Sequence, residues 1–120
     1  MAAAKSIPLV EPVEWFGRQI SVLWLKPPRA GHAHRFGEPR FLVIMGDGAR
    51  YFVERDEIVS RYLDELLSCD GIAPVDGGAV ALLETLSLAD GLQIKEALFD
   101  FFTDARAAIS KLNQTRSVST

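Results

Sequence analysis

The fold is decided by one long amphipathic segment, SLADGLQIKEALFDFFTDARAAISKL, at residues 87–112. Its apolar residues recur at intervals of three and four, which is the pattern of a helix with a broad buried face. This stripe comprises Leu88, Leu92, Leu98, Phe99, Phe102, Ile109 and Leu112, widened by Ile94, Ala97, Phe101, Ala105 and Ala108. Ser87 and Asp90 have the spacing of a capping box, so we expect the helix to begin there and to end near Leu112.

The start of the chain predicts a β-hairpin. The segment 7–15 contains Pro8 and Pro12, which restrict it to an edge strand or an extended arm. Residues 16–18 predict a turn, and residues 18–25 alternate between apolar and polar, as a half-buried strand does. The expected faces of that strand are Ile20, Val22 and Trp24 on one side and Gln19, Ser21 and Leu23 on the other.

A second hairpin is expected from residues 40–45 and 49–53, joined by the tight turn Gly46-Asp47-Gly48. The apolar run Phe41 to Met45 also fits the beginning of a buried helix, and residues 30–36 fit either one helical turn or a loop.

Two more helices are predicted between the hairpins and the long helix. Asp56 is a candidate cap for a helix over residues 57–68, which Asp70-Gly71 would close. The inner face of that helix comprises Ile58, Val59, Tyr62, Leu63, Leu66 and Leu67. Residues 74–78 form a connector, and residues 79–86 predict a short apolar helix.

These elements predict a single α+β domain, with N-terminal β-hairpins followed by a helical C-terminal part. The chain has 120 residues, of which 48% are hydrophobic and 24% charged, as in an ordinary globular domain. We assign residues 7–112 to the domain and expect residues 1–6 and 113–120 to be disordered. The net charge of −3 gives no reason to propose nucleic-acid binding.

The sequence favours the cytoplasm as the compartment. Cys69 is the only cysteine, so an internal disulfide is excluded. We find no apolar run of the roughly 18 residues that a membrane span requires, and the N-terminus lacks the apolar core of a signal peptide.

One group of residues has the spacing of a metal site. His32, His34 and Glu38 match the first motif of cupins, in which neighbouring strands offer imidazole and carboxylate to one ion. A cupin needs a second motif with another histidine, and no histidine follows His34. We therefore predict no metal site and no cofactor, and keep a cupin-like metal protein as an alternative.

Nucleophilic catalysis has little support in the sequence. Cys69 precedes Asp70, whose charge would raise the thiol pKa, and Ser60 and Ser68 have no histidine nearby in sequence. We predict no catalytic residues and no enzymatic activity.

Taken together, four segments resemble the small tail assembly chaperones of long-tailed bacteriophages and prophages, particularly the Mu-like group. The segments are Gly17-Arg18-Gln19-Ile20, then Leu25-Lys26-Pro27-Pro28-Arg29-Ala30-Gly31-His32, then Leu86-Ser87-Leu88-Ala89-Asp90, and finally Phe101-Phe102. An acidic helical middle, residues 56–71, lies between the second and third segments, as it does in that family. The resemblance spans most of residues 7–105.

The resemblance implies a non-enzymatic protein of the bacterial host cytoplasm. Such chaperones bind the long helical tape measure protein and assist assembly of the tail tube around it. The expected partner is therefore the tape measure protein, with the tail tube protein and self-association left open, and with no nucleic acid or membrane. We expect the partner surface to comprise Tyr62, Leu66, Leu98, Phe101 and Phe102, flanked by Lys26, Arg29 and Arg35. An unassigned bacterial adaptor module remains a further alternative.

Overall fold

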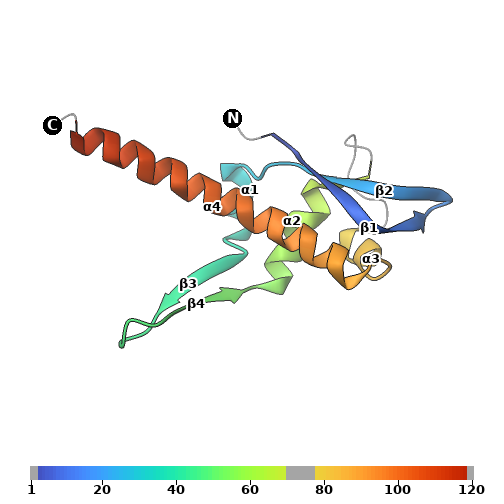
Figure 1. Ribbon diagram of the computed structural model, residues 1–120, viewed down its shortest axis with the longest axis horizontal. Helices are drawn as coiled ribbons and strands as arrows, with labels where there is room; N and C mark the ends of the chain where they lie inside the picture. The colour runs from blue at the N-terminus through green and yellow to red at the C-terminus, as the bar shows by residue number, and fades with distance from the viewer. Residues whose placement is uncertain (1–2, 70–77, 119–120) are drawn as a thin grey trace.

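The computed structural model describes residues 3–69 and 78–118 (Figure 1). Its elements are β1 (Lys5–Trp15), β2 (Arg18–Leu25), α1 (Ala30–Phe36), β3 (Arg40–Ile44), β4 (Arg50–Glu54), α2 (Asp56–Leu66), β5 (Leu67–Ser68), α3 (Ala79–Leu83) and α4 (Leu88–Val118). The predicted α+β class, with β-hairpins first and helices after them, is confirmed.

Two parts project from the body of the molecule (Figure 1). The C-terminal half of α4 extends beyond the other elements, and the β3–β4 hairpin extends from the same side of the body but diverges from α4. These projections give the chain an elongated outline of 59 × 34 × 27 Å.

The first sheet has the order β1-β2-β5, and all its pairs are antiparallel. The expected turn between β1 and β2 is present: Phe16 and Gly17 both have positive φ, 49° and 75°, as a type I′ hairpin turn requires. Strand β5 was not predicted, because we assigned residues 67 and 68 to the preceding helix. It pairs Leu67 with Leu25 and Ser68 with Trp24, which gives β2 a second neighbour.

A bulge in β1 lies opposite the middle of β2. Pro8 pairs with Val22 and Val13 with Ile20, so residues 9–12 of β1 lie opposite Ser21 alone. Such an insertion twists the strands and interrupts the strict alternation of faces. In β2, Leu23 and Leu25 are fully buried and Ile20 is nearly so, whereas Trp24 is 37% exposed. Buried side chains therefore come from both of the faces that the sequence predicted for this strand.

Asp90 fastens this bulge to the start of α4. Its Oδ1 accepts from the backbone N–H of Val10 at 2.7 Å, and its Oδ2 accepts from the N–H of Glu11 at 3.1 Å. The Ser87 hydroxyl and the Gln93 amide also donate to this carboxylate, and the backbone N–H of Asp90 donates to Ser87 Oγ. The predicted capping pair is thus present, but the Asp90 carboxylate mainly accepts from backbone N–H groups of β1, which is distant in sequence.

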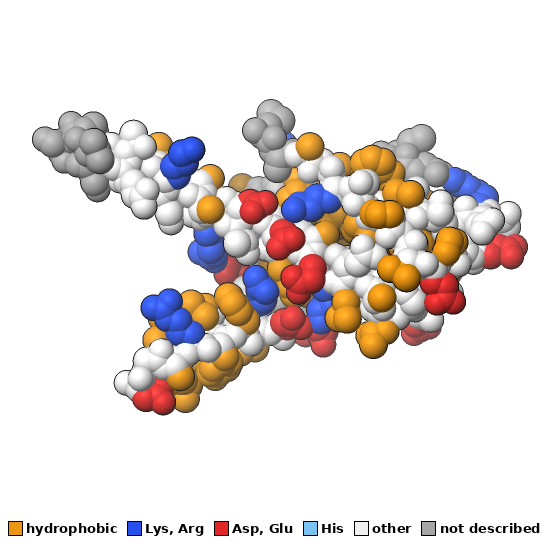
Figure 2. Space-filling model, viewed as in Figure 1, with side chains coloured by type: hydrophobic (Ala, Val, Ile, Leu, Met, Phe, Trp, Pro, Cys, Tyr) orange, Lys and Arg blue, Asp and Glu red, His pale blue; other side chains and the backbone are white. Residues whose placement is uncertain are grey.

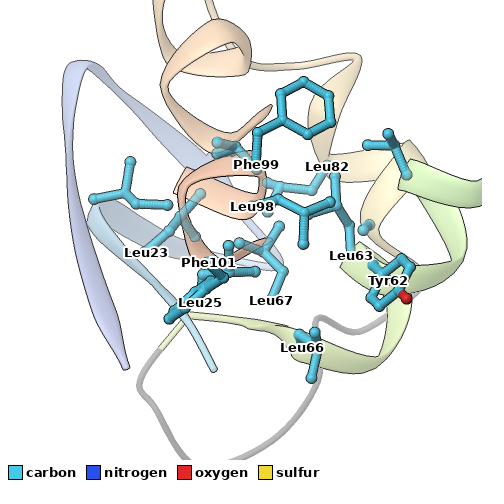
Figure 3. Packing of buried hydrophobic residues seen from close by; sticks show 14 of the residues in the cluster. Leu23, Leu25, Tyr62, Leu63, Leu66, Leu67, Leu82, Leu98, Phe99 and Phe101 are labelled. Carbon is cyan, nitrogen blue, oxygen red and sulfur yellow. The ribbon is translucent and has the colours of Figure 1, made fainter. Parts of the chain in front are cut away.

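The core lies between the first sheet and the helices α2, α3 and α4 (Figure 3). Its buried members are Ile7, Leu9, Ile20, Leu23, Leu25, Ile58, Val59, Tyr62, Leu63, Leu66, Leu67, Ala79, Leu82, Ile94, Leu98, Phe99 and Phe101. All six residues predicted for the inner face of α2 and its C-terminal extension are in this set.

Several element boundaries differ from those predicted. Strand β1 begins at Lys5, and α2 begins at Asp56 with Arg55 in the N-cap position, so Asp56 belongs to the first turn. Helix α3 ends at Leu83, and α4 continues past Leu112 to Val118. The predicted closure at residues 70–71 and connector at residues 74–77 lie outside the described residues.

The apolar stripe of α4 is covered only in its middle. Ile94, Leu98, Phe99 and Phe101 are buried, but Leu88 and Ile109 are 80% and 58% exposed. Leu92 and Leu112 are also exposed. The expectation that the whole stripe is buried was wrong. Toward the C-terminus the helix runs beyond the sheet and α2 (Figure 1).

Candidate partner-binding groove

A largely apolar groove of about 710 Å³ lies beside the C-terminal half of α4. One side is formed by the segment after β2 and by α1, where Pro27 and Pro28 end the strand because neither has a backbone N–H. The groove is lined by Ala3, Lys5, Pro27, Pro28, Arg29, Ala30, Ala33, Phe101, Phe102, Asp104, Ala105 and Ala108. The alanines leave space that longer side chains would fill.

Charged groups lie at the edge of this groove. Lys5 Nζ is 3.9 Å from Asp104 Oδ2 and 4.8 Å from the centre of the Phe101 ring, so it lies over that ring. Arg29 also lines the groove and is exposed. The groove therefore combines apolar walls with two basic groups at its edge.

Helix α1, which forms one wall, is held against α2 by Glu65. Both guanidinium nitrogens of Arg35 donate to the Glu65 carboxylate at 3.0 Å, and His32 Nε2 lies 3.2 Å from Glu65 Oε2. The Arg35 hydrogen bonds lower the pKa of the Glu65 carboxyl below its usual value, and the nearby His32 adds to this effect. His32 Nδ1 accepts from the backbone N–H of Arg29 at 2.9 Å, which fixes the start of α1 beside the groove.

A cluster of aromatic rings lies behind the groove. Tyr62 meets Phe36 and Phe102 edge to face, with ring centres 5.3 and 5.5 Å apart. The Tyr62 hydroxyl donates to the backbone oxygen of Gly37 at 2.6 Å. Burial raises the pKa of this hydroxyl, and the charge of Glu38 raises it further.

The structure separates the sequence-predicted partner residues into two groups. Arg29, Phe101 and Phe102 line the groove, although only the edge of Phe101 is accessible. Tyr62, Leu66 and Leu98 are buried in the core and do not line it. The expected groove between α2 and α4 is therefore closed by core packing.

The two remaining predicted cations lie outside the groove lining. Lys26 is partly exposed, and its backbone N–H donates to the carbonyl of Leu66. Arg35 is occupied by Glu65. The sequence reasoning missed the prolines and alanines of the walls, although Ala105 and Ala108 continued the α4 stripe and could have been noticed.

A second hollow, of about 490 Å³, lies between the β3–β4 hairpin and α4. Arg40 crosses it with its guanidinium carbon 4.2 Å from the centre of the Phe52 ring and 4.5 Å from that of Phe99. Because Phe99 belongs to the core, Arg40 joins the base of the hairpin to the body. Hydrophobic side chains gather over this hairpin (Figure 2).

The candidate metal residues are not brought together. His32 faces Glu65, and the Glu38 carboxylate pairs with the Arg106 guanidinium. His34 is exposed on α1. Among residues 3–69 and 78–118, no three histidine, cysteine or acidic side chains are grouped as a metal site would require.

The candidate nucleophiles lie in structural positions. The Ser60 hydroxyl donates to the backbone oxygen of Asp56 at 3.0 Å, and Ser68 is buried in β5. Cys69 is partly buried at the end of the first described segment.

No helix in the described part of the chain is long and apolar enough to cross a membrane. The fold and groove define an α+β domain with an open, largely apolar groove. No protein-family model, curated protein or solved structure matches the chain.

Proposed function

We propose that this chain is a tail assembly chaperone of a long-tailed phage or prophage, and that it binds the tape measure protein in the host cytoplasm. The observation that supports the proposal most directly is the composition of the groove. Two of the segments that carry the family resemblance, residues 25–32 and Phe101-Phe102, lie far apart in sequence and line the same groove.

The chemistry of the groove suits an amphipathic helix. A helix binds in such a groove through apolar residues spaced three and four apart, which replace water on the walls. Pro27, Pro28 and Phe102 offer rigid apolar contacts that lose little conformational entropy on binding. Arg29 favours an acidic residue at the border of the bound stripe, whereas the charge of Lys5 is offset by Asp104.

A chaperone role follows from covering such a stripe. A long protein made of amphipathic helices exposes apolar surface before it is assembled, and this surface promotes aggregation. Binding along the groove would cover one segment at a time. The role is non-catalytic and needs no cofactor.

The proposal is tested by co-expression with the long helical protein encoded in the same gene cluster, followed by size-exclusion chromatography. The expected result is that the long protein becomes soluble and elutes together with this chain. Ala108→Arg fills the groove with a charged side chain and should weaken binding at least about tenfold. Arg29→Glu should weaken it less, since it lies at the edge of the groove.

Ala107→Arg is the matched control. Ala107 is exposed on the same helix, next to Ala108 in sequence, and does not line the groove. The two variants add the same side chain to α4, and only one of them obstructs the groove. Equal binding by both variants would exclude this groove as the site, and a long protein that stays insoluble would exclude the chaperone function.

A further inference from the structure

The β3–β4 hairpin exposes apolar side chains on both of its faces. Leu42, Ile44 and Phe52 share one face, and Ile44 and Phe52 are 61% and 57% exposed. Tyr51 is exposed on the other face. A two-stranded hairpin is marginally stable alone in water, and an exposed edge strand is a template for pairing with another strand.

The backbone hydrogen bonds show which groups are turned outward. Met45 donates to Ala49 at 2.7 Å, and Arg55 donates to Pro39 at 2.8 Å, so these two pairs are hydrogen-bonded across the hairpin. Because bonded and non-bonded pairs alternate in an antiparallel ladder, the intervening register assigns the pairs of Arg50, Phe52 and Glu54 to the non-bonded set. The N–H and C=O groups of these three residues therefore point away from β3, toward the free edge of β4.

We propose that β4 pairs antiparallel with β4 of a second copy of this chain, about a two-fold axis at Phe52. In this register Phe52 lies opposite Phe52 of the second copy, and Arg50 lies opposite its Glu54. The symmetry repeats the Arg50–Glu54 pair on the other side of the axis. The outward N–H and C=O groups of all three residues meet their counterparts, and the product is a continuous sheet of order β3-β4-β4-β3.

Self-complementary charge identifies a second copy as the partner. Arg50 and Glu54 lie at equal distances in sequence from Phe52 and share one face of the strand. A two-fold axis at Phe52 therefore places Arg50 of each copy opposite Glu54 of the other, which forms two ion pairs. Glu54 already accepts from Lys95 Nζ through Oε2, at 2.7 Å, and Lys95 also lies 3.8 Å from Asp56 Oδ1. A carboxylate has several acceptor sites, so Glu54 can accept from Arg50 as well.

The edge of β3 lacks this property. The corresponding axis at Leu42 would place Arg40 opposite Ile44 of the second copy, which pairs a charge with an apolar side chain. Arg40 also lies against the rings of Phe52 and Phe99, which directs it toward α4. The free edge of β4 is therefore the self-complementary one.

The first test uses charge complementation and requires only the purified chain. Sedimentation analysis over a dilution series should show a monomer–dimer equilibrium for the unmodified chain. Arg50→Glu alone places two like-charged pairs across the axis, and Glu54→Lys alone does the same, so each should raise the dissociation constant at least about tenfold. An equimolar mixture of the two variants restores both ion pairs and should form a heterodimer as tight as the unmodified dimer.

The second test does not depend on charge. In a Cys69→Ser background, Phe52→Cys places two thiols at a hydrogen-bonded pair on the axis, where Cα atoms are about 5.5 Å apart and a disulfide can form. Mild oxidation should give a covalent dimer on non-reducing electrophoresis. Leu42→Cys is the control: it is an exposed position on the same face of the hairpin, and in the proposed sheet both β4 strands lie between the two copies of this residue.

A chain that stays monomeric at every concentration would overturn the proposal. So would a variant mixture that fails to associate, or Phe52→Cys cross-linking no more than Leu42→Cys. The proposal does not rest on the chaperone function, because the hairpin edge is separate from the groove lined by Phe102 and Ala108. Loss of the dimer with retained tape measure binding would reject only the dimer.

Discussion

The middle of α4 and its C-terminal part carry similar apolar residues in opposite environments. Leu98, Phe102, Ala105, Ile109 and Leu112 alternate in steps of four and three, so they form one continuous stripe. At its beginning this stripe is buried against the sheet and α2, and from residue 104 onward it is exposed. An amphipathic pattern thus identifies the apolar face of a helix without identifying what covers it.

The two hairpins show the same contrast. The β1–β2 hairpin contacts α4, and β2 also pairs with β5, so its inner face is part of the core. The β3–β4 hairpin forms a sheet of only two strands and is joined to the body at its base. In both comparisons the inner region is packed in the core, and the projecting region leaves apolar side chains exposed.

The contrast between the two parts of α4 is tested most directly by truncating an isoleucine in each of them. Ile94 is fully buried and Ile109 is 58% exposed. Ile94→Ala should cost about 2–5 kcal/mol of unfolding free energy, because it removes buried methyl groups and leaves a cavity. Ile109→Ala should change the free energy by less than about 0.5 kcal/mol, as exposed substitutions usually do.

Urea unfolding at low protein concentration measures both values. A dilute solution is needed because association would add its own stability. A large loss from Ile109→Ala would mean that the C-terminal part of α4 is packed in the monomer, and the contrast between the two parts would then disappear.

The bulge in β1 offers a second, smaller effect. Asp90→Asn keeps the size of the side chain but replaces one acceptor oxygen with an amide NH₂ group. That group would face a donor, either the N–H of Val10 or that of Glu11, so we expect a loss of about 1–3 kcal/mol at neutral pH. Chemical unfolding of the two proteins measures the difference.

The pH dependence of this difference sharpens the test. Burial raises the pKa of the Asp90 carboxyl, but the hydrogen bonds from Val10, Glu11, Ser87 and Gln93 outweigh it and hold the pKa below its ordinary value. A lowered folded pKa means that the contribution is present above the unfolded pKa of about 3.9 and is lost as pH falls through the folded value. The difference between the native chain and Asp90→Asn should be constant near neutrality and shrink below about pH 4. A constant difference across the acidic range would contradict this role.

Local patterns predicted most of the elements, because their causes are local. Alternation and turn residues located both hairpins, and the three-and-four spacing located α2 and α4. Errors occurred where distant parts of the chain meet. Strand β5 exists because Leu67 and Ser68 pair with β2, and the bulge in β1 exists beside Asp90, which accepts from the N–H groups of Val10 and Glu11.

The candidate groove was predictable only in part for the same reason. Phe102 and Arg29 were identified through the resemblance and do line the groove. Tyr62, Leu66 and Leu98 were assigned to the same surface, but periodicity alone cannot divide an apolar face between core and partner. The small residues of the walls had no chemical signal of their own, because their contribution is the space that they leave.

The smallest predicted effect concerns the connection between the core and the projecting hairpin. Tyr62→Phe removes the hydrogen bond to the Gly37 oxygen, just before β3, and should cost about 1 kcal/mol while keeping the ring contacts with Phe36 and Phe102. Because burial and Glu38 raise the pKa of Tyr62, its contribution is fully present below the unfolded pKa of about 10 and is lost at higher pH. In the Tyr62→Phe variant, amide hydrogen exchange should accelerate in β3 and β4 more than in β1 and β2. Equal acceleration in both hairpins would show that Tyr62 stabilises the core as a whole and has no separate effect on the β3–β4 hairpin.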